Sequence, residues 1–155
     1  MQRVCIKDSS VIHVRKGVTY VEIPNTVTNI ENDAFKNWNN LRKIVLPESL
    51  TTIGDGAFYN CSSLESITIP KSVTSIGKKS FYRCENIKSV IILGQINKIY
   101  EETFEYCRSL TNIELPESLT SIGNEAFYNC GSLVSIIIPE GVVSIGKYAF
   151  YNCRN

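Results

Sequence analysis

The sequence repeats one phrase at a constant period, and this period does not drift between the first copy and the last. It is best seen in six phenylalanines, Phe35, Phe58, Phe81, Phe104, Phe127 and Phe150. A unit this short cannot bury its apolar side chains alone, so its copies stack on one another and share a core. The sequence therefore predicts a solenoid in which each unit is one turn.

Each unit contains a short predicted strand. In the segment Ile67-Thr68-Ile69, apolar and polar residues alternate as they do in a half-buried strand. Pro70 follows at once and ends the strand, because proline has no N–H to donate. Strands that recur once per turn run in the same direction, so they are expected to pair in parallel at about 4.8 Å per turn.

The remainder of each unit is expected to turn the chain back toward the next strand. The segment Val73–Gly77 crosses a second face, and its glycine suits a crowded backbone position. Asp55–Cys61 starts with a capping residue, which predicts a helical or 3₁₀ turn. Phe58 is expected to point inward and to stack on Phe35 and Phe81.

The consensus L-x-x-I-x-I-P-x-S-V-x-x-I-G-x-x-A-F-x-x-C resembles the repeat unit of BspA-type leucine-rich repeats, over about Val18 to Asn155. The resemblance implies an α/β repeat solenoid. This would be a right-handed coil of about six turns, with one parallel strand per turn on a concave face. Such proteins are typically surface-associated adhesins or binding modules of anaerobic bacteria and parasitic protists. The family has no shared catalytic residues to carry over.

Both ends depart from the repeat. Residues 1–17 contain two apolar segments, Val4–Ile6 and Val11–Val14, which predict a β-hairpin. We expect 1–17 to be a cap on a single solenoid domain of residues 18–155, because the ends of solenoids need covering. The sequence ends in mid-unit at Asn155, before the leucine that would open the next unit. This favours either a fragment of a longer array or self-association through an uncapped last turn.

Five cysteines follow the periodic phenylalanines by three positions, and they pose the question of a chemical role. They should share the buried side of the turn, and Trp38 stands in the matching place of the first unit. Their separation by a whole repeat is unlike the short spacings of zinc sites, and stacked thiols rarely supply disulfide torsions. We interpret them as a core ladder, with an occasional disulfide or a metal site as alternatives: Cys61, Cys84, Cys107, Cys130 and Cys153.

A tyrosine directly follows the phenylalanine in four units and should lie at the outer rim. Two interpretations remain: ring stacking between turns that stabilises the solenoid, or an aromatic column that binds a partner. We favour stacking. The residues are Tyr59, Tyr82, Tyr128 and Tyr151.

The composition disfavours several classes of function. Sixteen basic and 15 acidic side chains give a net charge of +1, too little to attract nucleic acid or an anionic membrane. No apolar run is long enough to span a bilayer, and no secretory signal is visible. His13 is the only histidine, and no two carboxylates pair as an acid and a base would. We expect no enzyme, and no catalytic, cofactor-binding or metal-binding residues.

The predicted partner-binding residues are those that alternate with the buried positions of the strands. Val45, Ile91 and Ile137 among them are aliphatic, which indicates either a shallow apolar groove or simply good strand formers. One outward ladder is Tyr20, Lys43, Ser66, Ser89, Asn112 and Ser135, and the other is Glu22, Val45, Thr68, Ile91, Glu114 and Ile137.

The fourth unit departs from the consensus, with Leu93 in place of proline and Tyr100 in place of glycine. This indicates either a local bend or a surface modified for contact.

The sequence thus predicts a non-catalytic module that binds a protein through its concave strand face, in adhesion at a cell surface or outside the cell. The alternative is an intracellular structural scaffold, which unpaired cysteines would favour. Nucleic acid and membrane insertion are not expected.

Overall fold

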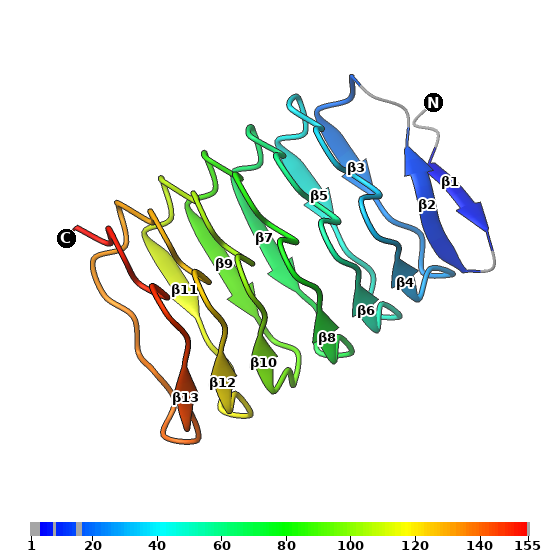
Figure 1. Cartoon of the computed structure of the whole chain (residues 1–155). Coiled ribbons are helices and arrows are strands. Elements are labelled where there is room, and N and C mark those ends of the chain that lie inside the picture. Colours follow the sequence, from blue (N-terminus) through cyan, green and yellow to red (C-terminus); the bar gives the residue numbers. More distant parts are fainter. Residues whose placement is uncertain (1–3, 8, 15–16, 155) are drawn as a thin grey trace.

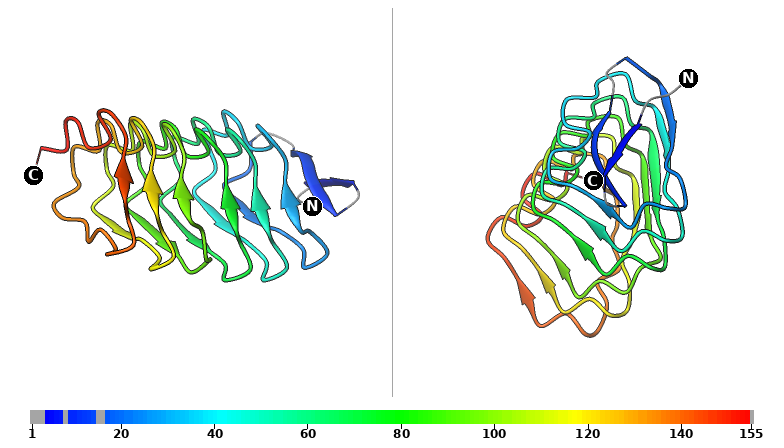
Figure 2. Two further views of the ribbon diagram at one scale, coloured as in Figure 1. Left: turned by 60° about the horizontal axis from the view of Figure 1, so that its bottom comes forward. Right: turned by 90° about the vertical axis from the view of Figure 1, so that its right-hand side faces the viewer.

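The protein is a β-solenoid of about five turns in the computed structural model, which describes residues 4–7, 9–14 and 17–154. The coils stack along one axis, with β1 (Val4–Lys7) at one end and β13 (Ser144–Ile145) at the other (Figures 1 and 2). Each coil has three faces: two carry strands, and the third is made of turns. The right-handed coiling and the concave strand face stay predictions.

The first strand face is one unbroken parallel sheet in the order β11-β9-β7-β5-β3. Its pairs join equivalent residues of successive units, as in Val21 with Ile44 and Ile67 with Val90, so the predicted strands and their register are confirmed. The strands are β3 Tyr20–Glu22, β5 Lys43–Val45, β7 Ser66–Ile69, β9 Ser89–Ile92 and β11 Asn112–Glu114.

The strand expected in the sixth unit is absent, because residues 135–138 form no strand. Ile136 and Ile138 are only half-buried, and Ile137 is 87% exposed. This last coil has a neighbour on one side only, so its side chains lose the second packing surface that the inner coils have. The prediction of six equivalent turns is therefore wrong in this detail.

The second face carries a strand of its own in each turn, where a single strand per turn was expected. Its strands are short because they lie between two bends, which also hides them from a periodicity argument. They are β2 Ser10–Val14, β4 Asn29–Ile30, β6 Thr52–Ile53, β8 Ser75–Ile76, β10 Lys98–Ile99, β12 Ser121–Ile122 and β13.

The expected N-terminal hairpin is present. Strand β1 pairs antiparallel with β2, and β2 pairs parallel with β4 through Ser10–Asn29 and Val11–Ile30. The hairpin thereby continues the second face beyond the first repeat (Figure 1). Its division from the solenoid as a separate cap of residues 1–17 stays a prediction.

The second face is interrupted at the fourth unit, between β8 and β10. Elsewhere a glycine lets neighbouring coils approach closely. A Cβ at Gly77 would lie 2.5 Å from the backbone nitrogen of Asp55, and the Gly77 N–H donates to Ile53 at 2.8 Å. Tyr100 occupies the equivalent place, and within the described residues its N–H makes no such bond. The change from glycine to tyrosine therefore leaves β8 and β10 unpaired with one another on the second face. We call this break in the strand pairing the seam.

The seam does not extend around the coil. Strands β7 and β9 pair across it on the first face. Two ion pairs also cross it, Lys78–Glu101 at 2.8 Å and Lys79–Glu102 at 3.1 Å. The irregular fourth unit is therefore a local separation within a continuous array.

The third face, as far as the structure describes it, contains no helix, so the predicted helical or 3₁₀ turns are wrong. The N–H of Phe58 donates to the carbonyl of Ser80 in the next coil at 2.8 Å, and that of Asn60 donates to Tyr82 at 2.7 Å. In an α-helix these bonds would go to residue i−4 of the same segment. Left-handed residues in each turn, such as Gly56 and Asn60, redirect alternate N–H groups toward the neighbouring coil.

Inside this face the six phenylalanines form one stack, as predicted. Neighbouring ring centroids are 5.1 to 5.3 Å apart and the planes differ by 3° to 11°. All but Phe150 are fully buried. Trp38 meets Phe35 edge-on at 5.3 Å in the first unit. The stack is the centre of the core.

The periodic cysteines lie beside this stack, and the first four are buried, as predicted. Each is a free thiol whose Sγ donates to the phenylalanine carbonyl of the preceding coil, for example Cys61 to Phe35 at 3.1 Å and Cys107 to Phe81 at 3.2 Å. Burial raises the pKa of the Cys61 thiol to about 12, and it raises those of Cys84 and Cys107 well above the ordinary value. These cysteines are hydrogen-bonded core residues.

Truncating one ring of the stack should be costly. We expect Phe81→Ala to lower the free energy of unfolding by about 3–5 kcal/mol, because it removes a fully buried ring with a neighbour on both sides. Urea denaturation followed by circular dichroism measures the change. Tyr82→Ala, in the outer column, is the control and should cost less. A loss below about 1 kcal/mol for Phe81→Ala would contradict a stack that supports the fold.

The buried thiols should resist modification in the native protein. Thiolate is the reactive form, and a raised pKa keeps Cys61, Cys84, Cys107 and Cys130 protonated past the ionisation of a free thiol near pH ~8.5. In a Cys5→Ser background, a thiol reagent at pH 8 should modify half-buried Cys153 first and the other four only after denaturation. Rapid native modification of all five would refute the buried ladder.

Candidate functional site

The first strand face presents the two predicted ladders outward. Side chains alternate along each strand, so that Ile67 is buried while Ser66 and Thr68 are exposed. Register aligns the first ladder, with Tyr20 beside Lys43, Lys43 beside Ser66, and Ser89 beside both Ser66 and Asn112. Ser135 is exposed but lies outside any strand. Five of the six residues therefore share one sheet surface.

The second ladder lies parallel to the first. Glu22 pairs with Val45, Thr68 with Ile91, and Ile91 with Glu114. Val45 is 38% exposed, Ile91 is half-buried, and Ile137 lies in the last coil outside any strand. The ladder thus places Val45, Thr68 and Ile91 between two carboxylates at its ends.

Two hollows lie on this face. The first, of about 240 Å³, is lined by Val45 and Thr68 with Glu48 and Pro70 from the following bends. The second, of about 440 Å³, is lined by Glu114, Glu117 and Ile137 among others. Both combine an aliphatic wall with carboxylates, a composition suited to a polar-rimmed protein contact.

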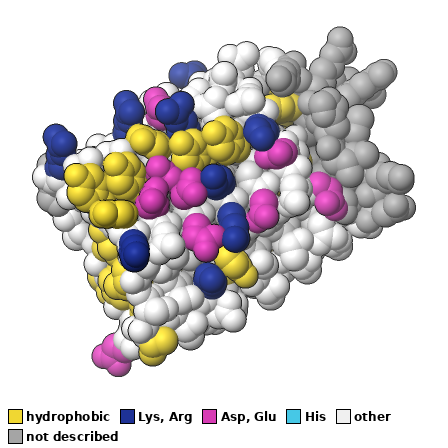
Figure 3. Space-filling model, viewed as in Figure 1, with side chains coloured by type: hydrophobic (Ala, Val, Ile, Leu, Met, Phe, Trp, Pro, Cys, Tyr) yellow, Lys and Arg dark blue, Asp and Glu magenta, His cyan; other side chains and the backbone are white. Residues whose placement is uncertain are grey.

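The turn face carries the aromatic column along its outside, and the expected stacking between turns is present. Tyr59 and Tyr82 stack with centroids 4.7 Å apart, and Tyr128 and Tyr151 stack at 5.2 Å. Tyr106 meets Tyr82 and Tyr128 edge-on at 5.8 Å. Figure 3 shows a band of hydrophobic side chains across the molecule, with Lys and Arg along its upper edge and Asp and Glu, interspersed with Lys and Arg, below it.

The column changes in the fourth unit, where the sequence reads Phe104-Glu105-Tyr106-Cys107. Glu105 occupies the place that tyrosine has in the neighbouring units, and the Tyr106 ring joins the column from the next position. The departure was visible in the sequence. What the sequence did not indicate is that Glu105 would be 5% exposed.

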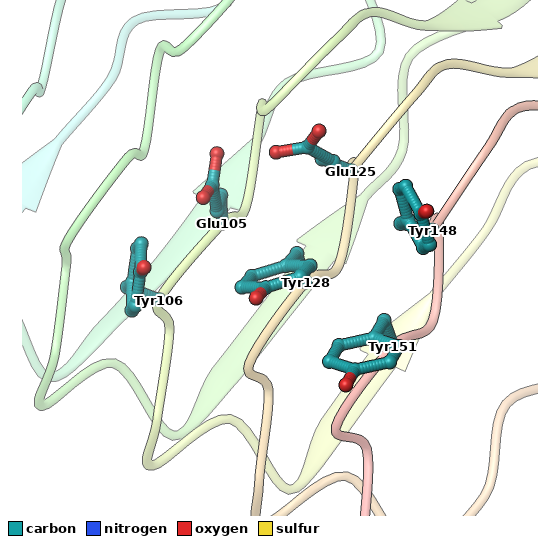
Figure 4. Close-up of a pocket in the computed structure, with 6 residues that line it drawn as sticks. All are labelled: Glu105, Tyr106, Glu125, Tyr128, Tyr148 and Tyr151. Atoms are coloured by element: carbon teal, nitrogen blue, oxygen red, sulfur yellow. The ribbon is translucent and has the colours of Figure 1, made fainter.

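Around this substitution lies a cavity of about 510 Å³. Figure 4 shows the carboxyl groups of Glu105 and Glu125 next to one another along one edge of the tyrosine row. Tyr148 and Tyr151, from a later coil, form the far end, with ring planes at 82° to each other. Sequence reasoning missed this cavity, which is lined by Glu105, Tyr106, Glu125, Tyr128, Tyr148 and Tyr151.

The electrostatics of the cavity are set by Glu105. Its Oε2 is buried and has no hydrogen-bond partner within the described residues. Burial, a side-chain hydrogen bond with Glu102 and the negative charges of Glu102 and Glu125 together raise the pKa of Glu105 to about 7, while Lys79 acts in the opposite direction. Near neutral pH this carboxyl is therefore poised between its two protonation states.

Among the residues that the structure describes, no three His, Cys, Asp or Glu side chains converge as metal ligands. The same part of the chain includes no helix that could cross a membrane. His13 lies in β2, and its side chain is outside the described part.

Solved structures of similar proteins share the coil. A leucine-rich repeat protein from Eubacterium ventriosum is 27% identical with a TM-score of 0.71, over 91% of this chain and 46% of that one. A leucine-rich cell surface protein from Faecalibacterium prausnitzii is 28% identical with a TM-score of 0.68, over 93% and 48%. The pneumococcal vaccine antigen PcpA, at 24% identity and a TM-score of 0.69 over 84% and 35%, is similar in fold alone. The chain thus spans about half the length of the first two and less of the third.

No curated protein sequence matches the chain. The sequence model of the BspA type leucine-rich repeat region, in contrast, matches six copies over residues 10–107 and 97–155. That match spans nearly all of the chain, and its repeats agree with the one-unit register of the sheets. The chain belongs to the BspA-type leucine-rich repeat family.

Proposed function

We propose that the chain is a non-catalytic protein-binding module that recognises its partner through the first strand face. The observation that carries the proposal is the in-register pair of outward ladders on an unbroken five-stranded sheet. Such a surface is rigid, because each strand is hydrogen-bonded to its neighbours, so binding costs little ordering of the backbone.

The chemistry of the second ladder suggests what a partner offers. Val45 and Ile91 form an aliphatic centre on either side of Thr68, and Glu22 and Glu114 flank it. A complementary surface has an apolar centre with Lys or Arg on either side. Carboxylates of Glu48 and Glu117 in the two hollows add to the same charge pattern.

A location at the cell surface, in adhesion, is the setting we propose. The similar F. prausnitzii structure is described as a cell surface protein. The competing proposal, an intracellular scaffold, draws on the free thiols of the described cysteines. Localisation of the full-length protein by fractionation separates the two.

Placing positive charges in the aliphatic centre tests whether the strand face binds the partner. We expect the double variant Val45→Lys and Ile91→Lys to lose at least tenfold in capture of partner proteins from cell extracts, because buried lysines oppose an apolar contact. Quantitative mass spectrometry of the captured proteins measures the loss. The matched control is Thr74→Lys with Thr120→Lys, two exposed residues beside the second face. Equal capture of partner proteins by both double variants would contradict a binding site on the strand face.

Self-association through the last turn stays a prediction. Ile137, Val143 and Ile145 are exposed apolar side chains there, and contact between two such surfaces would bury them. We expect light scattering coupled to size-exclusion chromatography to detect dimers at high protein concentration. A molar mass equal to that of the monomer at every protein concentration would contradict self-association.

A further inference from the structure

We propose that the turn face binds an alkylammonium group in the cavity between Glu105, Glu125 and the tyrosines of the last coils. This site lies outside the strand face to which the proposed function assigns the partner, so the two proposals can fail separately. Three observations point to this site: a buried carboxyl oxygen without a hydrogen-bond partner, two carboxyl groups without an ion pair among the described residues, and tyrosines that no Lys or Arg of the described chain covers.

The first observation is the buried carboxylate. Glu105 is only 5% exposed, and its Oε2 has no hydrogen-bond partner within the described residues. The carboxyl group has a side-chain hydrogen bond with Glu102, but burying its other oxygen without a partner costs free energy, which a tyrosine at this position would avoid. The group lines the cavity directly, where a cationic ligand would supply the missing partner.

The second observation is the charge balance. Glu105 and Glu125 line the same cavity, and neither forms an ion pair within the described residues. The Lys79 ammonium, which acts on Glu105 electrostatically, pairs with Glu102 at 3.1 Å. Two carboxyl groups therefore line one cavity, and neither has an ion-pair partner in the described part of the chain.

The third observation is the state of the rings. Elsewhere on the turn face the chain covers its tyrosines with its own cations. Lys36 lies 5.1 Å from the Tyr59 centroid, and Arg83 lies 5.3 Å from that of Tyr106. Arg108 approaches Tyr106 from 5.6 Å.

At the cavity this pattern ends. Within the described residues no Lys or Arg covers Tyr128, Tyr148 or Tyr151. Tyr148 and Tyr151 stand at 82°, so that two walls of the cavity meet at nearly a right angle. Because Tyr128 and Tyr151 stack on one another, a cation would contact Tyr148 and the ring surface that this stacking leaves free. Aromatic surface beside carboxylates is the combination that attracts organic cations.

The chemistry favours an ammonium group with carbon substituents. Its methyl or methylene groups contact the rings, and its charge meets Glu105 and Glu125. A lysine side chain and a free quaternary amine both offer this group, and the experiment distinguishes them. A small inorganic cation lacks the apolar surface that the tyrosines would contact.

The titration of Glu105 gives the site a pH signature. Its pKa of about 7 results from burial, from a hydrogen bond with Glu102 and from the charges of Glu102 and Glu125, against Lys79, and Glu105 also interacts electrostatically with Tyr82, Tyr128 and Cys130. A cation favours the ionised carboxyl, so binding releases a proton when the pH is below that pKa. Affinity should therefore rise about tenfold between pH 6 and pH 8.

Calorimetric titration of the whole chain tests the proposal. The probes are tetramethylammonium, N-acetyl-lysine methylamide and tert-butanol, which resembles the first in shape but has no charge. We expect at least one cation to bind, with release of a proton at pH 6, and the alcohol not to bind. Preference for tetramethylammonium assigns the site to a quaternary amine, and preference for the lysine derivative assigns it to a protein side chain.

Two variants make the test specific. Glu105→Gln keeps the shape and removes the charge, so it should weaken binding at least tenfold and abolish the rise with pH. Glu105→Tyr restores the column residue of the other units, which favours a folded protein, and should eliminate binding. The control is Glu48→Gln on the strand face, which should leave binding unchanged. Binding of the alcohol as strong as that of the cations, full affinity in Glu105→Gln, or no binding of either cation would overturn the proposal.

Discussion

The backbone hydrogen bonds that join one coil to the next are the constraint on which the rest of the structure depends. On the turn face, alternate N–H groups donate to the following coil at about 2.7 to 3.2 Å, as in Phe35 to Ala57 and Phe81 to Thr103. These bonds keep equivalent residues of successive coils directly above one another along the solenoid axis. The phenylalanine stack and the thiol–carbonyl hydrogen bonds form because this alignment is the same from coil to coil. An insertion within a unit would displace every contact at once, which explains why the repeat period is kept.

The three faces differ in how much variation they accept. The inner positions of the turn face hold phenylalanine and cysteine with little freedom, and the second face requires glycine wherever coils approach closely. Outward positions of the sheet and of the tyrosine column meet solvent and carry no such requirement. Changes such as Ile91 on the sheet and Glu105 on the turn face are therefore compatible with the same coil. In this architecture, function can vary on the outside while the inner frame stays the same.

Much of the fold could be predicted from the sequence because the period forces stacking. The strands of the first face in the first five units, their register, the buried phenylalanines and the buried cysteines all follow from that one fact, whereas the short strands of the second face do not. The turn was mispredicted because Phe58 and Cys61 are spaced as in a helix, while left-handed residues such as Asn60 send the N–H groups to another coil. The cavity at Glu105 could not be predicted, because it depends on Tyr148, which lies far along the sequence and two coils away.

The seam at Tyr100 has a mechanical consequence. Between the third and fourth coils the second face contributes no ladder, so the array is held there by the other two faces and by Lys78–Glu101 and Lys79–Glu102. Both ion pairs are partly exposed to solvent, and dissolved ions screen such attractions. A force that pulls the two ends of the solenoid apart would separate the coils first at this junction. The force needed would be lower in concentrated salt, because the ion pairs are then screened. The tyrosine at position 100 thus divides the solenoid into two mechanical segments, one on either side of this junction.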